Sequence, residues 1–163
     1  MLFRSFNLSI TSGKFPSQLK LSRIIPLHKG GSSELCDNYR PISLQSTLAK
    51  VLEKMVSVQL TNHLELNNLI HKNQFGFQRG KSTEQNLLLV IDYISKALND
   101  DEYCIGVFLD LRKAFDVCSH EVLLTKLKHM GIRDTELAWF SSYLENRHQR
   151  VDINGTLSDI LSI

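Results

Sequence analysis

The sequence predicts an α+β fold for one globular unit of 163 residues. Apolar residues recur at helical spacing in several blocks, and these blocks outnumber the strand-like runs. The strand-like runs are short and are bounded by polar turns. Hydrophobic residues make up 42% of the chain, which is enough for one sizeable core. No internal repeat or low-complexity linker divides the chain.

The amino-terminal half predicts one strand and two helices. The β-like run Arg23–Leu27 is followed by a Lys29-Gly30-Gly31 turn, whose glycines permit positive φ. The stretch Thr47–Leu66 predicts a long amphipathic helix. Its apolar positions are Leu48, Val51, Leu52, Met55, Val56 and Leu60. A second helix is expected from about Thr83 to Leu98, because Ser82 and Gln85 match a capping box.

The carboxyl-terminal half begins with a predicted buried strand. The run "YCIGVFLDL", Tyr103–Leu111, is short, aromatic and β-branched, with Asp110 near its end. Further on, Ser119 can cap a helix through about Lys128 that stops at Gly131. Another helix is expected from Asp134 or Thr135 through Leu144, and Asn154-Gly155 predicts a β-hairpin.

Charge and cysteine content restrict the function only loosely. The net charge of +2 is too small to predict nucleic-acid binding unaided. Met1–Ser33 has no acidic residue, which suggests either a phosphate-binding face or an unevenly charged solvated surface. Its cations are Arg4, Lys14, Lys20, Arg23 and Lys29. The widely spaced Cys36, Cys104 and Cys118 predict neither a disulfide framework nor a zinc site, and no apolar run approaches the roughly 20 residues that span a membrane.

The stretch "NQFGFQRGKST" ends like a phosphate-binding P-loop but has the wrong spacing. Gly76 precedes Gly80 by four positions, whereas the motif needs five, and no strand is predicted before it. The stretch instead predicts a turn that leads into a capped helix. Arg79 and Lys81 then lie at a helix amino terminus, where the dipole disfavours cations. A polyanionic ligand would resolve this conflict, and so would solvent exposure.

Asp110 is the candidate for carboxylate chemistry. Since it follows an apolar run, it should meet either a cation or a metal ion. Carboxylate oxygen suits magnesium, so Asp110 could form part of a metal site, and a structural ion pair with Arg or Lys is the alternative. The six histidines show no metal-binding spacing.

Three blocks, in order, resemble the reverse transcriptase domain of non-LTR (LINE-type) retrotransposons. They are "NYRPISL" (38–44), "QFGFQRGKST" (74–83) and "FLDLRKAFD" (108–116), and the similarity covers nearly the whole chain. The resemblance implies a right-hand polymerase fold. A helical fingers subdomain with a short β-hairpin would span residues 1–102, and a partial palm with an incomplete sheet would span residues 103–163.

The resemblance also implies roles for single residues. Asp110 matches the first catalytic aspartate, and the carbonyl of Leu111 is expected to share in binding two magnesium ions. Phe115 matches the aromatic ring that excludes a ribose 2′-hydroxyl. The triphosphate of the incoming nucleotide is expected near Lys29, Arg40 and the amides of Lys113 and Ala114. The residues expected along the template or primer backbone are Gln74, Gly76, Arg79, Gly80 and Lys81.

The implied partners are an RNA template, a DNA primer and deoxynucleoside triphosphates, at an intracellular site in the nucleus or cytoplasm. The family's Gly-Gln loop and its hairpin with paired aspartates have no counterpart in this sequence, so we expect a fragment that is inactive alone. Two alternatives stay open. One is a non-enzymatic nucleic-acid-binding remnant, and the other is an unstable product without function.

Overall fold

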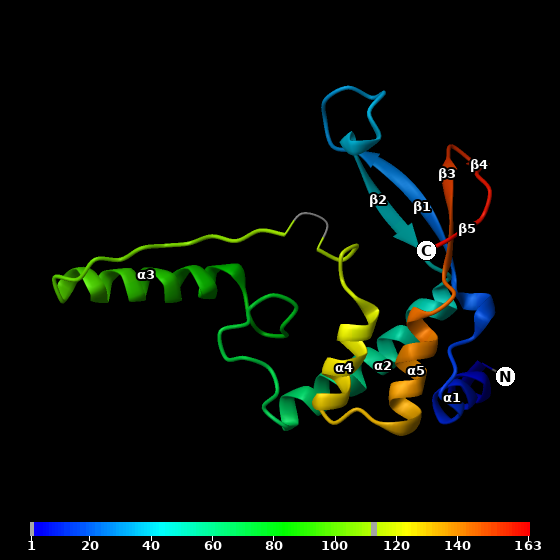
Figure 1. The fold of residues 1–163 in the computed structure, drawn as a ribbon, viewed down its shortest axis with the longest axis horizontal. Helices are drawn as coiled ribbons and strands as arrows, with labels where there is room; N and C mark the ends of the chain where they lie inside the picture. The colour runs from blue at the N-terminus through cyan, green and yellow to red at the C-terminus, as the bar shows by residue number, and fades with distance from the viewer. Residues whose placement is uncertain (1, 112–113) are drawn as a thin grey trace. The chain divides into compact units, whose positions relative to one another are not determined.

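The structure is a computed structural model, and it describes residues 2–111 and 114–163. It contains helices and one small mixed sheet, so the predicted α+β class is confirmed (Figure 1). The helices are α1 (Leu2–Ser12), α2 (Thr47–Leu66), α3 (Thr83–Asn99), α4 (His120–His129) and α5 (Asp134–Leu144), with 3₁₀ turns at Ser17–Leu19 and Cys36–Asn38. The strands are β1 (Leu21–His28), β2 (Tyr39–Leu44), β3 (His148–Ile153), β4 (Thr156–Leu157) and β5 (Leu161–Ser162).

The chain forms two compact units, which are described separately. The first unit comprises Met1–Thr61 and Cys118–Ile163, and the second comprises Asn62–Val117. The first unit contains the sheet, α1, α4, α5 and most of α2. The second unit contains the end of α2, the loop that leads to α3, α3 itself and the segment that follows it.

The sheet joins strands from both ends of the sequence. Its order is β2-β1-β3-β4, and β5 also pairs with β3. β1 and β2 are antiparallel, whereas β1 and β3 are parallel in the register Leu21↔His148 to Ile24↔Val151. The predicted hairpin at Asn154-Gly155 is confirmed, because β3 and β4 pair across it. Both turn residues have positive φ, 51° and 88°, as a tight hairpin turn requires.

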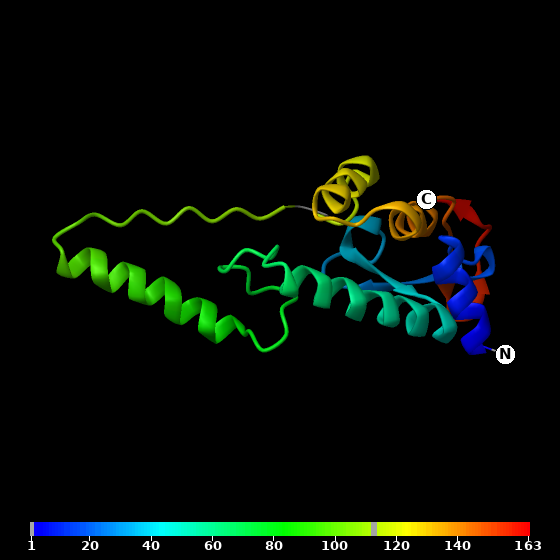
Figure 2. The same ribbon diagram turned by 90° about the horizontal axis from the view of Figure 1, so that it is seen from below.

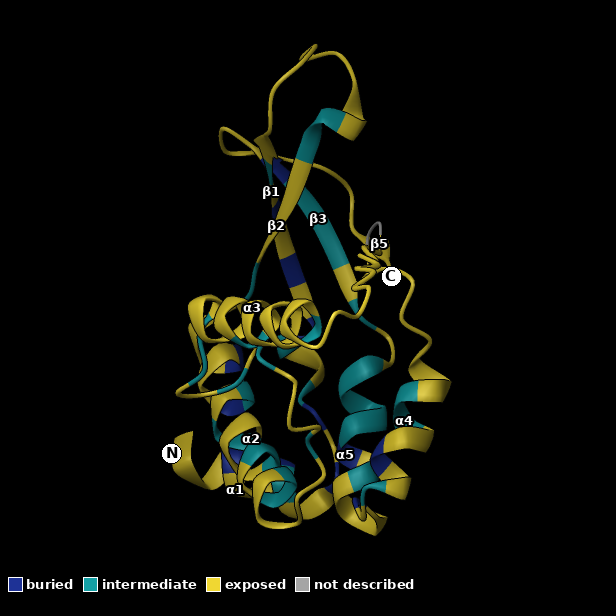
Figure 3. Cartoon of the chain, turned by 90° about the vertical axis from the view of Figure 1, so that its left-hand side faces the viewer, coloured by how far each residue is buried: buried dark blue, intermediate teal, exposed yellow. Residues whose placement is uncertain are grey.

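The core of the first unit lies between α1, α2 and α5. Its buried members are Phe6, Phe15, Ala49, Leu52 and Trp139, and Figure 3 shows buried positions in the helices and in the sheet. The Nε1 of Trp139 donates to the Oγ of Ser9 at 3.1 Å, and this Oγ donates to the carbonyl of Lys14 at 2.6 Å. The indole N–H is therefore satisfied although the ring is buried.

The predicted helices are confirmed. α2 has the expected bounds, Thr47–Leu66, and α3 begins at Thr83 after a complete capping box. Ser119 caps α4, and α5 runs from Asp134 to Leu144. α1 was not predicted: its apolar side chains Phe6 and Ile10 pack in the core, and this tertiary contact has no counterpart in a local motif.

The predicted buried strand at Tyr103–Leu111 is wrong. The segment after α3 is extended but pairs with no strand among the described residues (Figure 2). Its side chains are exposed, with 92% of Phe108 and 90% of Leu109 accessible. The residue pattern suits a strand, but a strand also needs neighbours that complete its hydrogen bonds and cover its apolar faces.

Candidate functional site

The β1–β2 hairpin presents two of the predicted nucleotide-binding cations. Lys29 is the first residue after β1, and its N–H donates to the carbonyl of Asn38 at 2.9 Å. Arg40 lies on β2 opposite Leu27, so both cations lie near the same end of the hairpin. Both residues are exposed. Within residues 2–111 and 114–163, the guanidinium of Arg40 has no hydrogen bond or ion pair, which leaves its forked donors open to an anion.

The loop that joins β1 and β2 is held by its own side chains. The Nδ2 of Asn38 donates to the carbonyl of Ser32 at 2.8 Å, and the hydroxyl of Tyr39 donates to the carbonyl of Ser33 at 2.9 Å. Gly31 has a φ of 85°, and a Cβ there would lie 2.8 Å from the Nδ2 of Asn38. Glycine is therefore required at this position, and the loop gives Lys29 a defined anchor.

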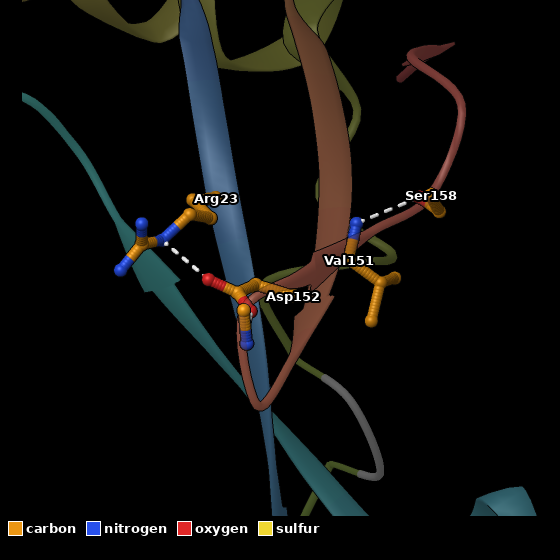
Figure 4. A network of polar contacts seen from close by, with 5 residues as sticks. Arg23, Val151, Asp152 and Ser158 are labelled. Atoms are coloured by element: carbon orange, nitrogen blue, oxygen red, sulfur yellow. Dashed lines mark hydrogen bonds and ion pairs between the residues drawn. The ribbon is translucent and has the colours of Figure 1, made fainter.

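One face of the sheet carries three arginines. Arg23 on β1 is the register partner of Arg150 on β3, and strand alternation puts Arg40 on the same face. Asp152 on that face pairs with Arg23, whose Nε lies 3.0 Å from its Oδ2 (Figure 4). No motif in the sequence indicated a role for Arg150. The alternation of β3 could have placed it on this face, but only the parallel register with β1 puts it beside Arg23.

The loop before α3 is built around Lys81. Its Nζ donates to the carbonyls of Lys72 at 2.7 Å and Gln74 at 2.9 Å, and it lies 5.0 Å from the ring centroid of Phe75. Gly80 has a φ of 75° and leads the chain into the cap of α3. The exposed Gln74 also donates weakly to the carbonyl of Gly76, at 3.4 Å. The predicted turn and capped helix are thus confirmed.

Arg79 differs from Lys81 in its surroundings. Its side chain is exposed, and the described part of the chain offers it no hydrogen bond or ion pair. Nearby, hydrogen bonds lower the pKa of the Glu84 carboxyl from its usual value. The largest effect comes from the Ser82 hydroxyl, and the next largest comes from the backbone N–H of Glu84 itself. A carboxylate in the first turn of α3 also suits the helix dipole.

The segment with Asp110 is the least enclosed part of the candidate site. Asp110 is exposed, and no cation of the described residues forms an ion pair with it. Leu111, Ala114 and Phe115 are also exposed, whereas Lys113 lies outside the described residues. The ring of Phe115 meets the ring of Phe77 edge to face, with centroids 6.4 Å apart. In the part of the chain that is described, no three His, Cys, Asp or Glu side chains gather as a metal site would require.

The predicted site residues therefore fall into both units. Lys29 and Arg40 belong to the first unit. The residues of the loop before α3, together with Asp110, Leu111, Ala114 and Phe115, belong to the second. The geometry of each group is defined inside its own unit. Among the described residues, no helix is both long enough and apolar enough to span a membrane.

Comparison with known proteins identifies relatives along most of the chain. The family described as "Reverse transcriptase (RNA-dependent DNA polymerase)" matches residues 27–160. The RNA-directed DNA polymerase from mobile element jockey of Drosophila melanogaster is 35% identical over 97% of this chain. The probable RNA-directed DNA polymerase from transposon X-element of the same species is 35% identical over 94% of this chain. A Pol polyprotein of retrotransposable element R2 from Popillia japonica is 33% identical over 77% of this chain. The chain spans 17% of the length of each of these relatives.

Proposed function

This chain belongs to the reverse transcriptase family, and from this premise we propose that it supplies nucleotide and template contacts to the RNA-directed DNA polymerase of a non-LTR retrotransposon. Two of the relatives are named RNA-directed DNA polymerases of mobile elements. The three sequence blocks occur in the order that is typical of this family. In this proposal, residues 1–102 act as fingers and residues 103–163 as part of a palm, and the β1–β2 pair is the fingers hairpin.

The nucleotide would meet cations on the hairpin and an aromatic ring on the segment after α3. Lys29 and Arg40 are exposed at one end of the hairpin, and a guanidinium can donate two parallel hydrogen bonds to phosphate oxygens. The backbone amides of Lys113 and Ala114 would add further donors. The ring of Phe115 would exclude a ribose 2′-hydroxyl by steric contact. The exposed Gln74, Gly76, Arg79 and Gly80 would follow the template or primer backbone, where phosphate contacts dominate affinity.

The family is metal-dependent, and we propose magnesium as the ion. The donor types fit, because Asp110 offers a carboxylate and Leu111 a backbone carbonyl, and magnesium prefers such oxygens. These two residues would form only part of the coordination shell. When bound, the metal would activate the primer 3′-hydroxyl and stabilise the leaving pyrophosphate. In this proposal, Asp110 would hold its carboxylate towards the ion.

The observation that carries the proposal is the open guanidinium of Arg40, at the same end of the hairpin as Lys29. Its test is the affinity of the chain for a deoxynucleoside triphosphate, measured by isothermal titration calorimetry. Arg40→Ala should weaken this binding about tenfold, because charge-assisted hydrogen bonds to phosphate oxygens are lost. Arg4→Ala is the matched control, since it removes one exposed cation from α1. Equal effects of both substitutions would count against the proposal.

A second candidate function is nucleic-acid binding without synthesis. It is favoured by the exposure of Asp110 on a segment that pairs with no strand among the described residues. Polymerisation needs the carboxylate held in a fixed geometry towards both metal ions. We therefore expect the chain alone to bind primer and template but to yield no extended primer with magnesium and deoxynucleotides. Extension by the purified chain, abolished by Asp110→Asn, would contradict this expectation.

A further inference from the structure

Lys81 uses its charge inside its own loop. Two of the three N–H donors of its ammonium group bind carbonyl oxygens, those of Lys72 and Gln74, at 2.7 and 2.9 Å. The same group lies 5.0 Å from the centroid of the Phe75 ring, a distance at which the ring attracts a cation. The Lys81 side chain thus closes a loop of nine residues against the start of α3.

These contacts explain how a cation is tolerated at a helix amino terminus. The dipole of α3 disfavours a positive charge beside its first turn. Two carbonyl oxygens and an aromatic face offset this cost without any external anion. Arg79, two residues earlier, has no such contacts within the described residues and is exposed to solvent. The two neighbouring cations therefore have different surroundings.

The loop that Lys81 closes has few other constraints. The N–H of Gln74 donates to the carbonyl of His71 at 2.9 Å, and the N–H of Lys81 reaches the carbonyl of Gln78 only at 3.4 Å. Phe77 is 95% exposed and has a φ of 58°, a region that costs energy for a residue with a Cβ. The N–H of Asn73 also donates to the Nδ1 of His71 at 3.2 Å, and the ring of Phe77 meets that of Phe115 edge to face. These contacts lie at one end of the loop or reach outside it, whereas the Lys81 ammonium joins the two ends of the loop.

We propose that Lys81 is a positioning residue, which fixes the loop 72–80 so that the free guanidinium of Arg79 meets a nucleic-acid phosphate. This inference rests on the proposed nucleic-acid binding, and it gives different roles to Arg79 and Lys81, which the sequence pattern does not distinguish. Arg79 makes the phosphate contact. Lys81 holds the backbone that carries Arg79, and its charge is shared with the carbonyls of Lys72 and Gln74.

The structural half of the test needs no nucleic acid. In the NMR spectrum of the full chain, the ε-methylene protons of Lys81 should be shifted upfield by the Phe75 ring, unlike those of exposed lysines. Lys81→Gln should speed exchange of the Gln74 amide proton about fivefold, because the loop opens more often. Arg79→Gln removes the same charge two residues away and should leave this exchange rate unchanged. Unaltered exchange in Lys81→Gln would overturn the positioning role.

The binding half uses an RNA–DNA primer–template as the probe. Arg79→Gln should lower the salt slope by about 0.9, as expected for one lost phosphate contact. Lys81→Gln should weaken binding with a smaller change in slope, and Lys81→Arg should restore affinity because a guanidinium can donate to both carbonyls. A full slope change of about 0.9 in Lys81→Gln would make Lys81 a phosphate ligand and overturn the inference.

The two proposals can fail independently. If the wild-type chain binds no primer–template at low salt, the proposed function fails, and the exchange measurement still decides whether Lys81 fixes the loop.

Should Lys81→Gln lose the helical circular dichroism of α3, Phe75→Leu replaces it as the test variant. This change removes the ring under the ammonium but keeps both carbonyl contacts, so it should give a smaller acceleration of the same amide. Exchange as slow as in the wild type would count against the inference.

Discussion

The Nε of Arg23 lies 3.0 Å from the Oδ2 of Asp152, and this ion pair joins β1 to β3 across their parallel register. Asp152 is 8% exposed, and its other carboxylate oxygen accepts the N–H of Gly155 at 2.8 Å. The hydroxyl of Ser158 accepts the N–H of Val151 at 2.9 Å on the same turn (Figure 4). The β3–β4 hairpin is thus tied to β1, the strand that leads to Lys29.

Loss of this ion pair should destabilise the first unit. Among the described residues, Arg23→Ala leaves the buried carboxylate of Asp152 with the Gly155 N–H as its one hydrogen-bond donor. We therefore expect the free energy of unfolding to fall by about 1–2 kcal/mol. Urea denaturation followed by circular dichroism measures this change. Arg40→Ala, on the same sheet face, is the control and should stay within about 0.5 kcal/mol of the wild type. If both variants unfold at the wild-type urea concentration, the pair does not stabilise the sheet.

The buried hydrogen bond between Trp139 and Ser9 should contribute more to the free energy of unfolding than an exposed hydrogen bond does. Ser9→Ala leaves the indole N–H without its acceptor and also removes the bond to the carbonyl of Lys14, which should cost about 1–3 kcal/mol of unfolding free energy. Trp139 is the only tryptophan, so its fluorescence reports the transition directly. Thr11→Ala on the same helix removes only exposed hydrogen bonds and serves as the comparison. Equal costs for the two variants would contradict the buried bond.

Gly13 should tolerate no side chain. Its φ is 65°, and a Cβ there would lie 2.8 Å from the carbonyl oxygen of Thr135 on α5. Gly13→Ala should therefore lower the unfolding free energy by about 1–3 kcal/mol, through backbone strain and displacement of α5. Thermal unfolding measures the loss. At Gly76 an added Cβ meets no described atom within 4 Å, so Gly76→Ala should be nearly neutral. Similar melting temperatures for both variants would show that α1 and α5 are less closely packed.

The raised pKa of Tyr143 predicts that the protein loses stability at alkaline pH. Burial raises the pKa of the Tyr143 hydroxyl above its usual value of 10.0, and the nearby carboxylate of Glu53 raises it further. The positive charge of Arg147 partly offsets this rise. The unfolded chain therefore releases the proton at lower pH than the folded chain. The stabilising contribution is complete below pH 10 and is lost as pH rises through the folded pKa. Urea denaturation at pH 9 to 12 should show a weaker decline for Tyr143→Phe.

The control for this titration is Tyr103, which is fully exposed. Tyr103→Phe removes an exposed phenol hydroxyl and should leave the decline as steep as in the wild type. A decline of equal slope in the Tyr143→Phe chain would show that its hydroxyl is not the group responsible.

Local signals in the sequence were sufficient for most helices. The apolar spacing of Thr47–Leu66 and the capping box at Ser82 mark α2 and α3, because both depend on residues within one or two helical turns. The β1–β3 pairing was not predictable in this way, since it joins strands from opposite ends of the chain. The segment Tyr103–Leu111 shows the reverse case, in which strand-like residues lack a partner strand among the described residues.

The sequence predicted which residue types form the candidate site, but it did not predict which contacts each side chain makes. The pattern at Arg79 and Lys81 shows two cations before a helix, and it cannot show that Lys81 turns back to the carbonyls of Lys72 and Gln74. Likewise, Arg150 becomes a neighbour of Arg23 only through tertiary register. The roles of Asp110 and Phe115 stay predictions that rest on the family motif.

The central claim is that the hairpin binds a deoxynucleoside triphosphate and that the loop before α3 binds nucleic acid, and NMR titration tests it most directly. Amide shifts of the ¹⁵N-labelled chain are followed as a deoxynucleoside triphosphate and, separately, an RNA–DNA primer–template are added at low salt. We predict that the nucleotide gives its largest changes at Lys29 and Arg40, that the primer–template gives its largest changes at residues 74–81, and that Arg40→Ala removes the changes at the hairpin. No shift at any of these positions, or shifts confined to α1 and α4, would contradict it.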